Sequence, residues 1–565
     1  MLKTVFLSSL HRVFPDQCPV ESAVSQLSCL ENEPLSFQAA FRLDDVEARS
    51  LLIYPRIETE LPVSLYYLGY VPVMHTHTGH LSNLPQPGLF GDMLLPKQVN
   101  PALEEHAVPW STRLVERGED VTLNAADDCW QSVWLCVNEK QRPLKPGKYP
   151  ITLRFYASVG GELLSESTFT VEIVAARLPK QKLMYTNWFH YDCLSDFYNE
   201  PVFSDRFFEI MRDYVEKAVR NGMNMLLMPA FTPPLDTPEG TYRKTAQLVK
   251  VTREKDEYSF DFSLMKRFLD VCRQAGMEYF EHSHLFTQWG AKAAPKIMAT
   301  VNGKEKRLFG WDTDASGKEY SKFLHAYLPA VRAFLREEKL EKKVLFHISD
   351  EPTEGNADSY ARAVATVGDL LNGCMCGDAL SEYLFYERGY VKTPIVVTPR
   401  VDDFAGRCDN LWAYYTGGQL QEGLSNRIMV VPPERNRMLG IQLYAYRIKG
   451  FLHWAYNFYY DVLSHGLFDP KCNPCGYNNH AGTTYFVYPS QDGTALQSAR
   501  QKVFFEGIND MRALEALEKR SGRAACDALI EKHFGKVTFH TCPASPEALL
   551  AFREELNHLA AQAEE

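Results

Sequence analysis

Two adjacent acidic residues, Asp350 and Glu351, end the segment KVLFHISDEP (343–352). The apolar residues before them are typical of a strand that is buried on both faces, as in a parallel sheet. Pro352 lacks an amide hydrogen and cannot extend a strand ladder. Because the carboxyl ends of the strands build the active site of a (β/α)8 barrel, the acidic pair is a candidate catalytic site.

The same pair also has a purely structural interpretation. The chain holds 71 Asp and Glu among 565 residues, so adjacent acids arise by chance, and many acids cap helices. The segment from Asp358 to Asn372 has a helical pattern, so the pair could belong to a polar loop that precedes a helix. The remaining elements must therefore decide between the two interpretations.

Polar and aromatic residues gather at the ends of four further predicted strands. In a barrel these ends converge on one mouth, where Trp and Tyr rings with hydrogen-bonding tips would suit a sugar ring. We expect the substrate-binding residues among them. The candidates are Asn187, Trp188 and His190 on the first strand, His284 on the third, Trp412, Tyr414 and Tyr415 on the seventh, and Trp454, Tyr456 and Asn457 on the last.

An alternation of apolar segments and helical patterns predicts the barrel itself. Helical patterns cover 207–221, 263–275, 318–338, 357–371 and 435–448. The eight predicted strands are 183–190, 223–229, 277–286, 344–351, 374–380, 394–399, 410–416 and 450–458.

The segments on either side of the barrel have different patterns. Residues 1–178 contain short strands with turn signals, which predict an antiparallel β-sandwich. The range from Tyr66 to Trp110 is predicted to be a long irregular insertion. A basic joint at 175–182 marks the first boundary, so the predicted domains are a sandwich (1–178), a catalytic barrel (179–520) and a helical tail (521–565) that includes a helix at 546–561.

Composition limits the class of partner and the compartment. The net charge of −11 argues against a nucleic-acid partner. The 13 cysteines form no disulfide framework, which favours a reducing compartment. The N-terminus lacks a signal-peptide pattern, and no apolar run is long enough to span a membrane. We therefore expect a cytoplasmic protein without membrane insertion; the oligomeric state is not indicated.

Two groups of residues have side chains that can bind metals, but for both groups we favour a role without a metal. His75, His77 and His80 have no Cys or carboxylate to complete a site, so a surface loop is favoured. Cys472 and Cys475 form a CxxC near His480 without a second pair at zinc spacing, so the metal interpretation is again disfavoured. The chain has no phosphate-cradling glycine loop, and we expect no cofactor and no metal.

Several motifs together resemble the catalytic region of glycoside hydrolase family 123, which overlaps the domain-of-unknown-function 4091 group. They are SDEP after an apolar strand, NLWAYYT, GFLHWAYNFYYD, YFVYPS and ALQSARQKVFFEGINDMRALEAL, and they cover roughly residues 180–520. The resemblance implies a β-sandwich followed by a (β/α)8 barrel. It also implies retaining hydrolysis of terminal β-linked N-acetylgalactosamine.

The resemblance further implies a substrate-assisted mechanism, an exception to the usual two-carboxylate scheme. Asp350 would orient the 2-acetamido group of the substrate, whose oxygen attacks the anomeric carbon to form an oxazolinium ion. Glu351 would protonate the leaving oxygen and later activate water. A tyrosine, either Tyr414 or Tyr415, would bond the acetamido carbonyl.

Three hypotheses follow for a protein that binds a glycan or glycoconjugate. The first is an exo-acting β-N-acetylgalactosaminidase. The second is a barrel glycosidase that acts on another glycan and uses the pair, Asp350 and Glu351, as an ordinary acid and nucleophile. The third is a carbohydrate-binding protein without catalysis, for which adjacent acids at a barrel mouth have little use.

Overall fold

The computed structural model describes residues 2–44, 50–76, 85–96, 114–117, 120–158, 160–421, 423–476, 480–542 and 545–561. Contacts divide the chain into two compact units. Unit 1 comprises Met1–Gln181, Gln419–Tyr446 and Asp469–Glu565, and unit 2 comprises Lys182–Gly418 and Arg447–Phe468. The first predicted boundary lies close to the start of unit 2. The predicted limit at 520 differs from this grouping, because 419–446 and 469–520 pack with the N-terminal sheets.

The N-terminal part of unit 1 forms two sheets. The first is antiparallel, in the order β1 (Leu2–Ser8), β3 (Leu35–Leu43), β9 (Trp130–Val137), β5 (Val63–Val73) and β6 (Gly88–Pro96). The second has the order β2 (Gln26–Leu30), β11 (Leu163–Val174), β10 (Gly147–Ala157), β4 (Ser50–Glu58), β8 (Asp120–Ala126) and β7 (Leu114–Arg117), with only β2 and β11 parallel. Phe37 of β3 stacks on Phe169 of β11, with ring centroids 4.2 Å apart, so apolar side chains of the two sheets pack together.

The predicted irregular insertion at 66–110 is partly wrong. Strands β5 and β6 pair antiparallel within this range, from Tyr66 opposite Pro96 to Val73 opposite Gly88. Gly69 and Pro72 are residues that usually interrupt a β-strand. Here a register irregularity between Gly69 and Tyr70 is accommodated, and the pairing continues past both residues.

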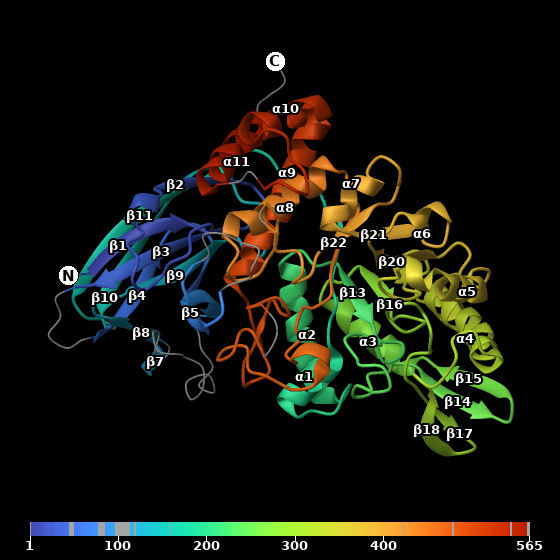
Figure 1. Ribbon diagram of the computed structural model, residues 1–565. Coiled ribbons are helices and arrows are strands. Elements are labelled where there is room, and N and C mark those ends of the chain that lie inside the picture. The colour runs from blue at the N-terminus through green and yellow to red at the C-terminus, as the bar shows by residue number, and fades with distance from the viewer. Residues whose placement is uncertain are drawn as a thin grey trace. The chain divides into compact units, whose positions relative to one another are not determined.

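Unit 2 is built on the predicted barrel, and all eight predicted strands are confirmed (Figure 1). Every pair in the closed sheet is parallel, including the last strand with the first. The strands are β12 (Met184–Asn187), β13 (Met225–Met228), β16 (Tyr279–His282), β19 (Val344–Phe346), β20 (Met375–Leu380), β21 (Thr393–Val397), β22 (Trp412–Tyr414) and β23 (Gly450–His453). Their inner residues, among them Leu345, Ile395 and Trp412, form one buried cluster.

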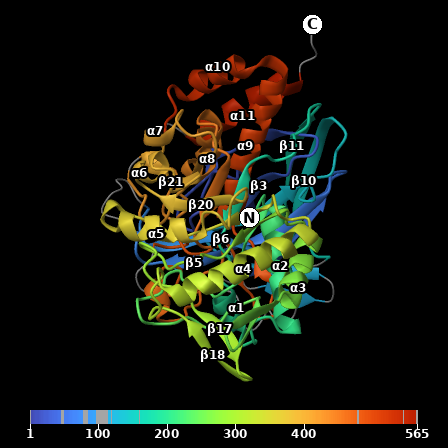
Figure 2. The same cartoon turned by 90° about the vertical axis from the view of Figure 1, so that its right-hand side faces the viewer.

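Helices α3, α4 and α5 lie outside the barrel strands, as Figures 1 and 2 show. The α-helices of unit 2 are α1 (Tyr191–Tyr198), α2 (Asp205–Arg220), α3 (Ser263–Gln274), α4 (Lys318–Glu337), α5 (Ala357–Val367), α6 (Leu384–Glu387) and α7 (Val401–Phe404). An additional sheet of β15 (Glu257–Asp261), β14 (Lys250–Glu254), β17 (Ile297–Val301) and β18 (Lys304–Phe309) was not predicted. It packs on α4 through rings such as Phe260 and Phe323, whose centroids are 5.9 Å apart.

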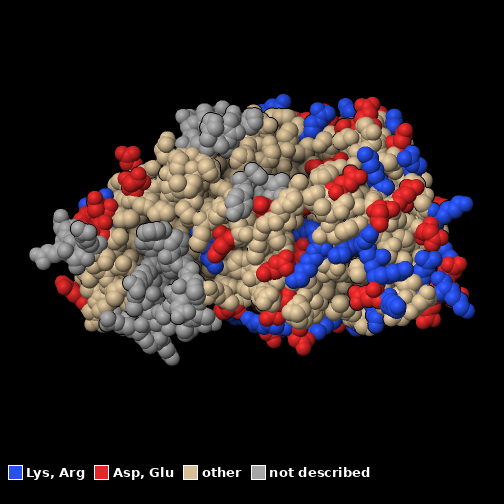
Figure 3. Space-filling view, turned by 60° about the horizontal axis from the view of Figure 1, so that its bottom comes forward, with Lys and Arg blue, Asp and Glu red and all other residues tan. Residues whose placement is uncertain are grey.

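Four helices complete unit 1: α8 (Pro433–Ala445), α9 (Ala499–Ser521), α10 (Arg523–Phe534) and α11 (Pro546–Ala561). A short hairpin of β24 (Tyr488–Pro489) and β25 (Ala495–Leu496) precedes α9. Helices α8 and α9 cross at two glycines, since a Cβ atom on Gly440 would lie 1.7 Å from the carbonyl oxygen of Gly507. No helix within the described ranges is both long and apolar enough to cross a membrane. On the face shown in Figure 3, Lys and Arg are interspersed with Asp and Glu.

Candidate active site

The segment that carries the two acids is fixed by the neighbouring strand. Strand β19 ends at Phe346, and Asp378 of β20 accepts hydrogen bonds from the backbone N–H groups of Ile348 (2.9 Å) and Ser349 (3.2 Å). The Ser349 hydroxyl donates to the carbonyl of Thr287 at 2.7 Å. The two bonds to Asp378 satisfy the backbone N–H groups that lie beyond the sheet ladder. Together with the Ser349 bond they fix the backbone that leads to the next residue, Asp350.

Glu351 is held in a left-handed backbone conformation with φ of 42°. Its N–H donates to the carbonyl of Ala379 at 3.0 Å, and its Oε1 accepts from the hydroxyl of Tyr414 at 2.6 Å. A left-handed conformation is costly for a residue with a side chain and is found disproportionately at functional sites. Here it turns the second acid toward the same cavity as the first.

The electrostatics of the pair favour a bound proton. Burial, followed by the negative charges of Glu351 and Asp378, raises the pKa of Asp350 well above its usual value, while His347 opposes the shift. Burial and the adjacent Glu351 also raise the pKa of Tyr414, which therefore stays a hydroxyl and can donate. The negative charge of a neighbouring carboxyl group disfavours ionisation, so Asp350 retains a proton more readily in the free enzyme.

A buried chain of polar groups lies behind the acids. Glu281, fully buried, accepts hydrogen bonds from Trp188 Nε1 at 3.0 Å and from His347 Nε2 at 2.9 Å. The other ring nitrogen of His347 lies 3.5 Å from Asp378, which also accepts from Tyr360 at 2.5 Å. Burial alone would lower the pKa of His347, but hydrogen bonds to Asp378 and Glu281 and their charges raise it to about 9. The chain thus connects a cavity-lining ring, Trp188, to the backbone before Asp350.

The two acids line an open cavity of about 170 Å³ at the mouth of the barrel. Three of the residues that line it have a positive φ, which is unusual for residues with a side chain: Asp236 (44°), Trp289 (59°) and Glu351 (42°). Their convergence on one cavity marks it as the functional site of unit 2. The full lining is Trp188, Leu235, Asp236, Gln288, Trp289, Asp350, Glu351, Ala379, Tyr414, Thr416, Leu452 and Trp454.

Three of the ten predicted binding residues line this cavity together with the acids: Trp188, Tyr414 and Trp454. The two neighbouring tyrosines are distinguished, because Tyr414 lines the cavity while the Tyr415 ring packs on Phe451 with centroids 5.1 Å apart. Trp412 belongs to the buried cluster inside the barrel. Neither Tyr415 nor Trp412 is among the lining residues.

The other five predicted binding residues are buried behind or beside the cavity. Asn187 donates to the Tyr185 hydroxyl at 2.7 Å, and Tyr456 donates to the Tyr214 carbonyl at 3.2 Å. Asn457 accepts the N–H of His190 at 2.9 Å. His190 contacts the Trp454 carbonyl with Nε2 at 2.9 Å, and His284 stacks on His347 with centroids 4.6 Å apart. These side chains support the site from behind.

Sequence reasoning missed the lining contributed by the loops after β13 and β16. Asp236 lies eight residues beyond the end of β13, and Gln288 and Trp289 lie six and seven beyond the end of β16, too far for a rule based on strand ends. Burial raises the pKa of Asp236 to about 6, although Arg243 acts to lower it. Asp378 could have been found, since it lies in a predicted strand next to the one that carries the acids.

The residues weighed as metal ligands do not gather into a site. Within the described residues, one group of three has possible ligand atoms that lie within 4.8 Å of one another: Glu172, Glu554 and His558. Cys472, Cys475 and His480 are not part of it. Glu554 and His558 are paired with each other at 3.0 Å. His77 and His80 lie outside the described residues.

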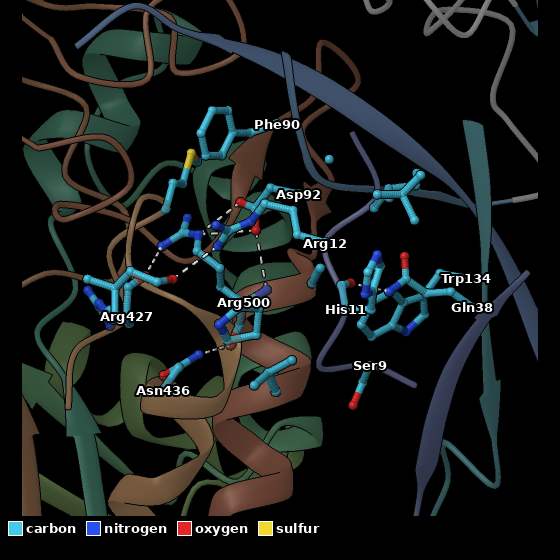
Figure 4. A pocket seen from close by; sticks show the side chains of 18 of the residues that line it. Ser9, His11, Arg12, Gln38, Phe90, Asp92, Trp134, Arg427, Asn436 and Arg500 are labelled. Atoms are coloured by element: carbon cyan, nitrogen blue, oxygen red, sulfur yellow. Dashed lines mark hydrogen bonds and ion pairs between the residues drawn. The ribbon is translucent and has the colours of Figure 1, made fainter. Parts of the chain in front are cut away.

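A second cavity, of about 30 Å³, belongs to unit 1 (Figure 4). Figure 4 shows Arg12, Asp92 and Arg500 grouped on one side and His11, Gln38 and Trp134 on the other. Asp92 and Arg500 form a buried ion pair at 3.0 Å, and Arg500 also donates to the carbonyls of Arg427 and Gly482. Such a paired arrangement holds chain segments together and has no adjacent acids for hydrolysis.

The fold and the sequence were compared with known proteins. A family 123 glycoside hydrolase from Clostridium perfringens, described for glycolipid glycan hydrolysis, has a TM-score of 0.71 at 13% identity over 99% of this chain and 97% of that chain. A family 39 glycoside hydrolase from Bacteroides cellulosilyticus WH2 has a TM-score of 0.31 at 9% identity, covering 70% of this chain and 76% of that chain. A β-glucuronidase from Ruminococcus gnavus has a TM-score of 0.30 at 10% identity, covering 90% and 97%. Only the first of these likenesses is close enough to support the fold.

The family assignment rests on sequence as well as fold. Among curated proteins, no sequence matches this chain. The sequence model described as "Glycoside hydrolase 123, catalytic domain" matches residues 188–517, more than half of the chain, and this range contains every barrel strand after β12, the two acids and their cavity. The chain therefore belongs to glycoside hydrolase family 123 and is a glycoside hydrolase.

Proposed function

We propose that this enzyme is a retaining exo-glycosidase that releases terminal β-linked N-acetylgalactosamine, with the acetamido group of the substrate as nucleophile. The observation that carries the proposal is the adjacency of Asp350 and Glu351 in one cavity, with Tyr414 bonded to Glu351 at 2.6 Å. Adjacent acids suit a reaction in which the enzyme supplies no nucleophile, because the spacing between nucleophile and acid is then unconstrained.

In the proposed first step, Asp350 accepts the acetamido N–H and the acetamido oxygen attacks the anomeric carbon. Glu351 protonates the glycosidic oxygen, the bond to the leaving group breaks, and an oxazolinium ion remains. The raised pKa of Asp350 belongs to the free enzyme; the positive charge that develops on the acetamido group favours the ionised form of Asp350, and the carboxylate then stabilises that charge. Glu351 then takes a proton from water, which attacks the anomeric carbon and restores the acetamido group with retention.

Tyr414 would change its hydrogen-bond partner when substrate binds. Its hydroxyl has one proton to donate, and in the free enzyme it donates to Glu351. If the acetamido carbonyl takes that hydrogen bond instead, Tyr414 helps to orient the acetamido group, and Glu351 is left to serve the glycosidic oxygen.

One observation favours a second candidate function. Asp236 is a third carboxyl group on the cavity wall, so a glycosidase of another glycan could pair it with Glu351 in an ordinary two-carboxylate scheme. The two schemes predict different effects of replacing Asp236. Asp236→Asn would abolish turnover if this carboxylate were the nucleophile, and would mainly raise KM if it binds hydroxyl groups. Family membership leaves little support for the non-catalytic alternative.

The substrate is tested with aryl β-glycosides of N-acetylgalactosamine, N-acetylglucosamine, galactose and glucose. Hydrolysis of the acetamido sugars alone, with N-acetylgalactosamine preferred and the β-anomer formed first by NMR, is the expected result. Hydrolysis of plain hexosides at comparable rates would replace the proposal with the two-carboxylate candidate.

Two further expectations stay proposals. The two N-terminal sheets, whose phenylalanine rings pack together, support the sandwich arrangement implied by the family resemblance. No disulfide joins the cysteines among the described residues, which supports the cytoplasmic location that we propose from composition.

A further inference from the structure

Trp289 presents an aromatic ring to solvent at the rim of the catalytic cavity. Its residue is 49% exposed, the exception among the tryptophans that line the cavity, since Trp188 is 3% exposed and Trp454 is partly buried. Trp188 and Trp454 each make an edge-on contact with a histidine ring, whereas no ring contact of Trp289 is found within the part of the chain that the structure describes. A large exposed apolar group beside a binding cavity is a candidate ligand contact.

The loop that carries Trp289 is firmly held. The Trp289 N–H donates to the Asp350 carbonyl at 2.9 Å, and the Ser359 hydroxyl donates to the Gly290 carbonyl at 2.5 Å. The loop is closed by Thr287, whose N–H donates to the Ala293 carbonyl at 3.0 Å and whose hydroxyl accepts the Ala293 N–H at 3.2 Å. The backbone of Trp289 is therefore held at a fixed place relative to Asp350.

The backbone conformation of the loop is costly. Trp289 and Ala291 have φ of 59° and 53°, and Gly290 between them has φ of 119°. A Cβ atom at Gly290 would lie 2.8 Å from the side chain of Asn356, so a residue with a side chain would have to displace it. Two residues other than glycine in the left-handed region persist only where the surroundings impose them, and such strain concentrates at binding and catalytic sites.

Beside Trp289, a second loop supplies a carboxylate at a defined position. Gln288 Oε1 accepts the backbone N–H of Asp236 at 3.0 Å, and Gln288 Nε2 donates to the Thr237 carbonyl at 3.2 Å. Gln288 is thus a positioning residue that ties the two loops together, and Asp236 is the group that can accept from a ligand hydroxyl.

The exposure of the rings indicates which part of a substrate each would meet. An exo-acting enzyme holds the terminal sugar deepest, where Trp188 and Tyr414, each 3% exposed, line the cavity. The next sugar lies farther out, where the half-exposed Trp289 stands. We propose that Trp289 and Asp236 form a subsite for the sugar ring of the leaving group, with the indole stacking on its apolar face and the carboxylate accepting from its hydroxyls. This inference rests on the proposed function.

The test compares two substrates that share the terminal sugar. N-acetyl-β-galactosaminyl fluoride has no ring in the leaving group, whereas a disaccharide of β-linked N-acetylgalactosamine on galactose has one. In Trp289→Ala, kcat/KM for the disaccharide should fall at least about tenfold more than kcat/KM for the fluoride, mainly through KM. Trp289→Phe, which keeps a flat ring, should recover most of that loss. Tyr242→Ala is the matched control, since Tyr242 is an exposed aromatic residue of unit 2 (39%) that does not line the cavity.

Each other outcome overturns the inference. Equal losses on the two substrates would assign Trp289 to the terminal sugar or to folding, and no selective loss would leave the ring without a role in binding. A failure of Phe to restore the disaccharide would exclude stacking. If the wild-type enzyme does not hydrolyse the fluoride, the proposed function fails first and the subsite for this leaving group falls with it.

Discussion

His347 should contribute pH-dependent stability, because it lies between two buried carboxylates. Its ring nitrogens are 2.9 Å from Glu281 and 3.5 Å from Asp378, and His347 and Glu281 are fully buried. Hydrogen bonds and charge from the two acids outweigh burial and raise the pKa of His347 from 6.5 to about 9. A shift of this size corresponds to about 3 kcal/mol of folding free energy. His347→Gln should lose about 3–5 kcal/mol, since it leaves two buried acids without their cation.

The sign of the pH dependence follows from the raised pKa. The contribution of His347 is fully present below pH 6.5, the unfolded value, and is lost as the pH rises through about 9. Urea denaturation between pH 6 and pH 9.5 should show a decline in wild-type stability that His347→Gln lacks. The control is His282→Gln, a buried histidine whose pKa burial lowers to about 4, so its loss should leave the decline unchanged. An unaltered decline in His347→Gln, or a loss below about 1 kcal/mol, would refute the assignment of an imidazolium.

Three further predictions concern the catalytic pair and metals. Glu351→Gln should reduce turnover of natural glycans by about 10²–10⁴-fold, and turnover of substrates with activated leaving groups by less. Steady-state kinetics on both kinds of substrate will measure the difference. Near-normal turnover of natural glycans would show that Glu351 is not the general acid. The same substitution should also move the acidic limb of kcat/KM to lower pH, because the charge of Glu351 helps to raise the pKa of Asp350. Asp350→Asn should weaken inhibition by a thiazoline analogue of N-acetylgalactosamine, and a covalent 2-fluoro-sugar adduct on Asp350 would instead establish it as a nucleophile. Activity should survive EDTA; a loss restored by zinc would revive Cys472, Cys475 and His480 as ligands.

One of the motifs that resemble family 123 has a structural role. In the EGIND segment of α9, Gly507 allows the close crossing with α8. Asp510 pairs with Arg437 at 2.7 Å and with Arg553 at 2.7 Å, and Glu506 pairs with Arg437 at 3.2 Å. These charges are buried and paired with one another, so replacing any one would leave another uncompensated. The motif therefore identifies the family without forming part of the catalytic cavity.

Local sequence patterns were sufficient to predict the barrel and the position of the two acids at the end of one of its strands. Alternating apolar segments and helical patterns are local features, and a buried strand such as β19 must expose its first polar residues where the ladder ends. For this reason Asp350 and Glu351 were found before any contact was known. Periodicity failed at β5, where Gly69 and Pro72 interrupt the pattern but not the pairing.

The residues that line the cavity beside the acids could not be predicted from local patterns, because they depend on contacts between distant segments. Side chains of adjacent residues on a strand point to opposite faces, so Tyr414 and Tyr415 are equivalent in composition but not in direction. Trp289 and Asp236 come from long loops, whose paths depend on hydrogen bonds to distant segments such as the bond from Trp289 to Asp350. Loop conformation is fixed by these long-range contacts, not by local sequence pattern, and the outer half of the site could therefore be seen only in the folded chain.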